Sequence, residues 1–383
     1  MWLFLSFRDC KTLLVRKKVH CCTIISAIPR LRGLINLTIM KLQNRQLRKG
    51  LAMCMAALSA TFLITSCSKD AGVSPQTTQP TSMTSTAPVN FTSQSLAATY
   101  TTHAAVSYQG KSNFTISGLS ITGGTYCIYL NNCSNVTITN CRLVSASKYE
   151  VYMTGNCKNV TMTNCYVTGG VSGVHVENSS TIKINSNQFK NINGPFPGGN
   201  FVQFVSVNGG GNQINNNRCE DIAGVGKPED GLSVYQSNGL PGDSIQVIGN
   251  WIRGGQYYNT SGGGAAIVLG DVGGSYQVAR NNIVVNGGFV GMQVQGGTHI
   301  KMDHNTIYGG VTPYSNCGLC YGNYSGKSSS DINMSYNKVR YYKTNGQEQD
   351  VWTSGLTPTG WSTNIQKAAI TAGILPTTII TLN

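Results

Sequence analysis

A six-residue phrase, apolar–x–x–Asn–x–apolar, recurs along this chain and constrains its fold more than any other feature. Its clearest copy runs from Val278 to Ile283, with Asn281 at the fourth position. Nine copies or close variants follow one another at steps of 22, 24, 22, 30, 33, 31, 24 and 32 residues. The Asn position is occupied in turn by Leu119, Cys141, Cys165, Asn187, Asn217, Asn250, Asn281, Asn305 and Asn337. A step of about 22 residues is close to one coil of a solenoid, so the longer steps indicate coils with loop insertions.

A stack of coils gives this phrase a physical reason. Its apolar residues would point inward from two short strands that meet at a bend. Asn tolerates unusual backbone angles at the bend, and its amide can bond the Asn of the neighbouring coils. An ordinary β-sandwich rich in Asn turns is the alternative, but it has no reason to place Asn at coil-length steps. We therefore predict an all-β chain, in which residues 98–345 form a parallel β-helix of about nine coils with an internal Asn ladder.

On these repeats, residues 98–345 resemble the right-handed parallel β-helix of the pectate-lyase-like superfamily. The resemblance implies the fold. That superfamily includes lyases, hydrolases, isomerases, adhesins and inert spikes, so it implies no single activity.

The basic charge of the chain is concentrated at its N-terminus. The formal net charge is +14, but residues 1–66 hold 11 of the 28 Lys and Arg residues and one of the 14 acids. The remainder has 17 basic and 13 acidic residues, which leaves +4. The basic bias is therefore not a property of the repeats, and we expect no nucleic-acid partner.

Residues 1–66 are interpreted as a targeting segment, with a signal peptide over 40–66. A basic run is followed by the apolar stretch Leu51–Ile64, which is short for a membrane span. A genuine membrane anchor is the alternative. The end of this stretch, Leu63 to Cys67, resembles the cleavage box of bacterial lipoproteins. The resemblance implies a lipid on Cys67, membrane contact only through that lipid, and a location in the outer membrane or on the cell surface of a Gram-negative bacterium.

Two further segments flank the repeats. Residues 67–97 are rich in Ser, Thr and Pro and predict a flexible linker. Residues 346–383 break the repeat pattern, and we expect them to cap the last coil.

A second, shorter strand precedes most Asn phrases, and its middle residue should face outward because side chains alternate along a strand. The predicted outward column is Tyr129, Tyr152, His175, Gln203, Ser233, Ile267, Gln293 and Cys320. Insertions such as Gly224–Asp230 and Gln256–Gly264 lie just before these strands. We expect the insertions to wall a groove whose floor is this column.

Acidic residues are rare after residue 66, yet four lie within eleven positions: Glu220, Asp221, Glu229 and Asp230. Three interpretations stay open. Paired carboxylates could act as general acid and base on a glycosidic bond. The four acids could instead bind calcium that bridges to a uronate, with Lys227 or an arginine as the base for β-elimination. They could also only cap a loop and pair with Lys227 and Arg218.

The remaining candidates lie on or beside the predicted groove. His175 could transfer a proton, and Arg253 is a further catalytic candidate. Sugar contacts are expected from Tyr129, Tyr152, Gln203, Tyr257, Tyr258, Arg280 and Gln293. The alternatives are an aromatic ladder that only stabilises the sheet and ordinary surface charges.

The sequence thus predicts a cell-surface, carbohydrate-active protein, a monomer, with no cofactor other than a candidate calcium ion. A polysaccharide lyase or hydrolase acting on an acidic, uronate-containing glycan is the favoured function. A non-catalytic glycan-binding or adhesive surface protein is the alternative.

Cysteine spacing leaves two possibilities. The pairs Cys133/Cys157 and Cys141/Cys165 are each 24 residues apart, so each pair should lie at matching places on adjacent coils. They could form disulfides or pack as free thiols. Cys317 and Cys320 form a lone CxxC, and zinc would need further ligands.

Overall fold

The computed structural model describes residues 99–194, 198–255, 264–324, 326 and 329–380. The targeting segment, Cys67, the linker up to residue 97, Tyr257 and Tyr258 lie outside the described residues. In the described part, strands are joined by loops and by two short 3₁₀ helices, η2 (Trp361–Thr363) and η3 (Ala372–Ile374). None of the helices in these ranges has the length and apolar character that crossing a membrane requires.

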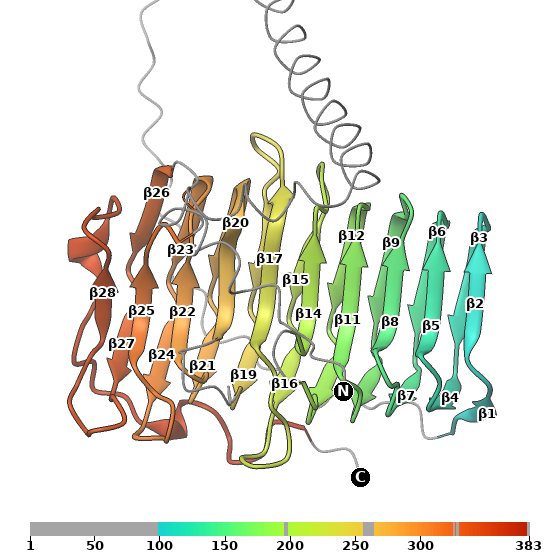
Figure 1. Ribbon diagram of the computed structural model, residues 1–383, viewed down its shortest axis with the longest axis horizontal. Coiled ribbons are helices and arrows are strands. Elements are labelled where there is room, and N and C mark those ends of the chain that lie inside the picture. Colours follow the sequence, from blue (N-terminus) through green and yellow to red (C-terminus); the bar gives the residue numbers. More distant parts are fainter. Residues whose placement is uncertain (1–98, 195–197, 256–263, 325, 327–328, 381–383) are drawn as a thin grey trace, which may run out of the picture. The chain divides into compact units, whose positions relative to one another are not determined.

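The strands stack as parallel coils with three faces (Figure 1). The first face consists of β2 (Val106–Gln109), β5 (Tyr126–Asn131), β8 (Tyr149–Thr154), β11 (Ser172–Glu177), β14 (Asn200–Val205), β17 (Asp230–Asn238), β20 (Ala265–Arg280), β22 (Val290–Val294), β25 (Cys317–Tyr321) and β28 (Val351–Thr353). The second face consists of β3 (Ser112–Ser117), β6 (Ser134–Thr139), β9 (Lys158–Thr163), β12 (Ser180–Asn185), β15 (Gln213–Asn215), β18 (Ile245–Ile248), the second half of β20, β23 (Thr298–Asp303) and β26 (Ser330–Ser335).

The third face is a separate ten-stranded sheet. It consists of β1 (Thr101–His103), β4 (Leu119–Thr122), β7 (Arg142–Val144), β10 (Tyr166–Thr168), β13 (Gln188–Lys190), β16 (Arg218–Glu220), β19 (Trp251–Arg253), β21 (Ile283–Val285), β24 (Thr306–Gly309) and β27 (Lys338–Tyr341). Alternate side chains of all three faces fill one continuous apolar core, as the predicted parallel β-helix requires.

The Asn ladder runs through the bend between the second and third faces. Each ladder amide before the last donates to the Oδ1 of the next coil, for example Asn250 Nδ2 to Asn282 Oδ1 at 2.9 Å. The same Nδ2 donates to the carbonyl of Ile214 at 2.8 Å. The full ladder in the described chain is Asn187, Asn217, Asn250, Asn282, Asn305, Asn337 and Asn364. These side chains satisfy buried backbone groups that the bend leaves without strand partners.

Two predicted registers are wrong by one residue, one at the bend that follows β20 and one within β20. The ladder member is Asn282, whereas Asn281 occupies the left-handed bend before it with φ 54°. The outward residue of the first face is Val268, which pairs with Ser233 and Gln293, whereas Ile267 faces the core. The second slip arises because all five residues from Ala265 to Leu269 are apolar, so the sequence pattern does not show which of them alternate outward.

In the N-terminal coils, cysteine side chains occupy the ladder position in place of Asn. Cys165 N–H donates to Asn187 Oδ1 at 3.1 Å, and Cys141 N–H donates to Cys165 Sγ at 3.5 Å. Cys133, Cys141, Cys157 and Cys165 are all buried free thiols. Of the two possibilities for these pairs, the structure therefore shows packing without disulfides.

The repeats extend beyond the predicted boundary at residue 345. Strand β28 pairs with β25, and Asn364 completes the ladder below Asn337. The chain then returns along the third face. Leu375, Ile379 and Ile380 are buried there against residues that include Tyr166 and Val285. The C-terminal segment thus covers the last coil and also packs across earlier coils. Its part from Leu375 to Ile380 is called the strap below.

Replacing Asn250 with Ala should lower the free energy of unfolding by about 2–4 kcal/mol, because Asn217 and the Ile214 carbonyl lose buried partners. Urea unfolding followed by circular dichroism measures it. The control N208A removes an exposed Asn that bonds Asn238 outside the ladder, and should cost less than about 1 kcal/mol. Equal losses in both variants would contradict a special role of the ladder.

Candidate functional site

A groove of about 550 Å³ lies on the outer side of the first face, along its C-terminal strands. Its lining comes from strands β17, β20, β22, β25 and β28 and from the loops beside them. Three carboxyl groups line one part of it, and aromatic and amide side chains line the rest. This mixture of clustered acids, amides and exposed rings is the chemistry that sugar-binding grooves use.

The carboxyl groups of Glu229, Asp230 and Asp271 meet at the β17–β20 part of the groove. Asp230 is 8% exposed, and its Oδ1 accepts from Ala265 N–H at 2.8 Å. Burial, followed by the charge of Asp271, raises the pKa of Asp230 well above its ordinary value. Burial also raises the pKa of Glu229. These groups therefore retain protons at pH values where ordinary carboxyls are ionised.

Asp271 lies in the irregular part of β20, opposite Tyr235. Burial raises the pKa of Asp271 to about 6, although the Ser233 hydroxyl, 3.3 Å from Oδ2, opposes the shift. Asp271 is then mostly ionised at neutral pH, while the deeper burial of Asp230 favours its protonated form more strongly. Neighbouring carboxyls whose environments separate their pKa values form a general acid and a general base.

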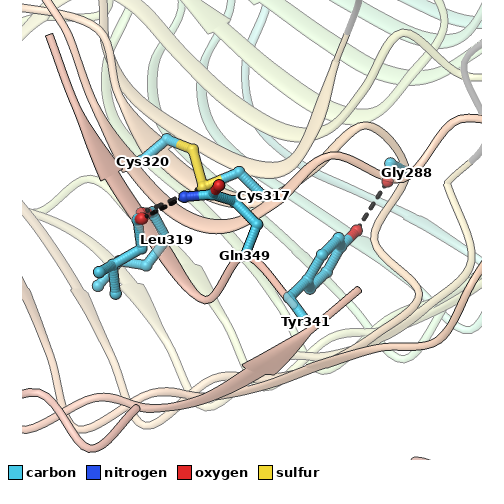
Figure 2. Close-up of a disulfide and its surroundings, with 7 residues drawn as sticks. Gly288, Cys317, Leu319, Cys320, Tyr341 and Gln349 are labelled. Carbon is cyan, nitrogen blue, oxygen red and sulfur yellow. Dashed lines mark hydrogen bonds between the residues drawn. A yellow bond between two sulfur atoms is a disulfide. The ribbon is translucent and has the colours of Figure 1, made fainter. Parts of the chain in front are cut away.

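The other part of the groove belongs to the last coils. Cys317 and Cys320 form a disulfide within β25, and Gln349 lies beside it (Figure 2). Beyond the disulfide, Trp352 of β28 stacks on Tyr324 with ring centroids 6.3 Å apart and planes 18° apart. Trp352 is 41% exposed and Tyr324 is 56% exposed. Flat, partly exposed rings beside amide groups suit the apolar faces and hydroxyls of a sugar.

Tyr341 supports this end of the groove from inside. Its ring is fully buried and its hydroxyl donates to the Gly288 carbonyl at 2.7 Å (Figure 2). Tyr341 of the third face packs beneath Gly318, in the strand that carries the disulfide, and so joins the two faces there.

Of the predicted site residues, Glu229, Asp230 and Gln293 line the groove. Lys227 lies in the loop before β17, where its backbone N–H donates to the Ile192 carbonyl, and it is not part of the lining. His175 and Gln203 occupy the same outward column as Ser233, on coils nearer the N-terminus. They do not line the groove either.

Tyr129 and Tyr152 lie farther along that column, within a stack of rings. Tyr149 covers His175, with centroids 4.3 Å apart and planes 4° apart, and Tyr126 stacks on Tyr149. Glu177 accepts from both the Tyr152 hydroxyl and His175 Nε2. Burial lowers the pKa of His175, against the effect of Glu177. The rings face one another rather than the solvent, which is the arrangement of a ladder that stabilises the sheet.

Arg253, a catalytic candidate, and Arg280, a predicted sugar contact, both lie elsewhere. Arg253 extends from the third face to the C-terminal strap, where Nη2 donates to the carbonyls of Leu375 at 3.0 Å and Pro376 at 2.6 Å. Arg280 is paired with Asp303 on the second face, with Nη2 2.9 Å from Oδ2. Sequence reasoning placed both arginines near the groove. It could not show that the C-terminal segment returns along the third face, or that β20 continues from the first face into the second.

The four acids proposed to bind calcium do not form one cluster. Glu220 and Asp221 line a different cavity, of about 460 Å³, together with Arg253. Glu220 accepts from Ile379 N–H at 3.2 Å, and Asp221 accepts from Ile192 N–H at 2.9 Å. Burial raises the pKa of Asp221 to about 8, which favours its neutral form. Over the described ranges, no group of three or more His, Cys, Asp or Glu is arranged to hold a metal.

Sequence reasoning missed Asp271, Tyr324 and Trp352. Asp271 lies within β20, two residues after the apolar run that ends at Leu269, and the rarity of acids in this part of the chain was an available signal. Trp352 follows Cys320 by 32 residues, a coil-length step, but the predicted boundary at residue 345 excluded it. No sequence signal identifies Tyr324.

The stacked coils define a parallel β-helix protein, and comparison with known proteins agrees. Residues 104–272 match the family described as "Right handed beta helix region". The predicted right-handed parallel β-helix is therefore confirmed. No curated protein matches the chain.

Several solved structures are similar at low identity. DFA-IIIase from Arthrobacter chlorophenolicus A6, without its lid and in complex with GF2, is 12% identical with a TM-score of 0.38, over 68% of this chain and 58% of that one. A mannuronic acid specific polysaccharide family 6 lyase from human gut microbiota is 11% identical with a TM-score of 0.26, over 67% and 76%. The tailspike protein of E. coli bacteriophage HK620, in complex with a hexasaccharide, is 12% identical with a TM-score of 0.22, over 66% and 53%. The chain spans about three-fifths of the DFA-IIIase structures that it matches.

The raised pKa of Asp271 predicts a pH-dependent effect of the Asp271→Asn substitution. An unfolded Asp titrates near 3.9, so the native state holds this proton more tightly, and its stabilising effect is lost as pH rises from about 4 through 6. Relative to the wild type, D271N should therefore gain about 1–2 kcal/mol of unfolding free energy between pH 4 and pH 7. Urea unfolding at both pH values measures this gain. A difference that does not change with pH would contradict the assignment.

Proposed function

We propose that the protein is a carbohydrate-active enzyme that cleaves glycosidic bonds in the groove of the first face. The observation that carries the proposal is the meeting of Glu229, Asp230 and Asp271 in one groove with raised pKa values. Glycosidic bond cleavage needs one carboxyl that is protonated and one that is ionised at the same pH. This groove holds Asp271, whose pKa is about 6, together with two carboxyls that burial shifts toward their protonated forms.

The roles follow from the different burial of Asp230 and Asp271. Asp230, the more buried, would donate its proton to the glycosidic oxygen as the bond to the anomeric carbon breaks. Asp271, ionised above about pH 6, would take a proton from the attacking water. Glu229 lines the groove with the pair, and the negative charge of ionised Asp271 stabilises a positively charged, oxocarbenium-like transition state.

Hydrolysis fits the groove better than β-elimination. Elimination from a uronate needs cationic groups that neutralise its carboxylate beside the base. Among the described residues that line the groove, Lys343 is the one basic side chain, and it belongs to the last coil rather than the acidic part. A uronate-containing glycan would then place its carboxylate toward Lys343, away from the bond that is cleaved.

We also propose, from the N-terminal sequence alone, that Cys67 is lipidated and that a monomeric enzyme is held at the cell surface by this lipid. Labelling cells with a fatty-acid analogue tests this proposal. The label should appear in the wild type and be absent from C67S, and equal labelling of both proteins would refute it.

Cleavage is tested by incubating the protein with neutral polysaccharides (fructan, glucan, xylan) and uronate polymers (alginate, polygalacturonate). We expect new reducing ends without unsaturated ends on at least one polymer. D230N and D271N should each lower kcat/KM by about 10²–10⁴-fold, and the wild-type rate should have an ascending limb near pH 6 that D271N lacks.

The control for these variants is D331N. Asp331 is an exposed carboxyl paired with His299 on the second face, so its loss should leave the rate unchanged. Unsaturated ends would favour a lyase instead. Binding without any product would favour the non-catalytic alternative and refute the enzyme.

A further inference from the structure

Trp352 extends the floor of the groove to the last strand of the first face. The registers align Ser233, Val268, Gln293, Cys320 and Trp352 as one outward-facing column. Ser233, Val268 and Cys320 are buried, and Gln293 is 8% exposed, whereas Trp352 is 41% exposed. The column therefore ends in a large, accessible ring at the end of the groove away from the carboxyl groups.

The surroundings of this ring favour a sugar over a purely apolar ligand. Tyr324 holds the indole from one side in a near-parallel arrangement. The amides of Asn316 and Gln349 line the same part of the groove, and so does the ammonium of Lys343. A sugar ring combines an apolar face with hydroxyls at its edge, which matches an aromatic surface bordered by hydrogen-bonding groups.

The separation between Trp352 and the carboxyl groups sets the shortest glycan chain that can contact both. Four strand-to-strand steps lead from β17, which carries Asp230, to β28, which carries Trp352. At about 4.8 Å per step this is roughly 19 Å, or about four sugar units laid along the solenoid axis.

We infer that Trp352 and Tyr324 form a remote sugar-stacking subsite, which makes the protein selective for glycan chains long enough to reach from the carboxyl groups to the last coil. The inference rests on the proposed function for the bond that is cleaved, but the binding subsite stands on its own geometry. A chain shorter than about four units occupies the acidic part alone and gains nothing from the indole.

The test uses size-defined oligosaccharides of two to eight units, prepared from fructan, xylan and polygalacturonate. Cleavage rates are measured for the wild type, W352A, W352F and the control Y336A. Tyr336 is 56% exposed and stacks on His304, outside the groove. Binding is measured in parallel by isothermal titration calorimetry with D230N and with the double variant D230N/W352A, so that substrate is not consumed.

For a cleaved series, the wild-type kcat/KM should rise about 10-fold as the chain grows past four units and then level off. W352A should lose this rise and match the wild type on the shortest cleaved chain, while W352F keeps part of the rise and Y336A keeps all of it. An equal loss at every length in W352A, or no length dependence in the wild type, would overturn the inference.

Calorimetry separates the two proposals. If no series is cleaved but D230N binds long chains more tightly than short ones, and the added W352A removes that difference, the subsite is supported and the proposed reaction is refuted. If D230N binds no chain of any length, the subsite is refuted as well.

Discussion

The structure depends on the pairing of each coil with its neighbours through buried polar groups. The strands satisfy their own backbone, but every bend leaves N–H and carbonyl groups inside the core. The Asn ladder satisfies them in the C-terminal coils, because each amide accepts from one coil and donates to another. An apolar side chain at these positions would fill the space and leave those groups unpaired. The ladder therefore sets the register in which strands β17 to β28 present their outer side chains.

The groove arises where this regular register is interrupted by the bulged pairing of β17 with β20. A regular solenoid has a flat outer face. Here β17 and β20 are the longest strands of the first face and pair with bulges, which places Asp271 opposite Tyr235, in the groove that Asp230 also lines. Burying several carboxyls together has an energetic cost, which appears as raised pKa values. The same environment that destabilises their ionised forms makes proton transfer available near neutral pH.

Sequence reasoning predicted the solenoid, the ladder and the face that carries the groove, because these follow from periodicity, and the resemblance to known β-helices implied the right-handed coil. It failed where periodicity is ambiguous or broken. Asn281 and Asn282 both fit the repeated phrase, and only the pairing with Asn250 and Asn305 distinguishes them. Glu229 and Asp230 were identified from the rarity of acids, but the same criterion added Glu220 and Asp221, which belong to another face. Contacts with the strap could not be foreseen for Arg253, since they join residues more than 100 positions apart.

The strap has a consequence for how the molecule unfolds. In a simple solenoid each coil contacts only its neighbours, so the ends can fray one coil at a time. Arg218, Glu220 and Arg253 bond to the strap on the third face, and Ile379 is buried there among side chains of several coils. Loosening of the last coils is thereby coupled to release of the middle ones. The chain from β16 to the C-terminus should open as one cooperative unit, which keeps the groove intact while the N-terminal coils exchange their amide hydrogens independently.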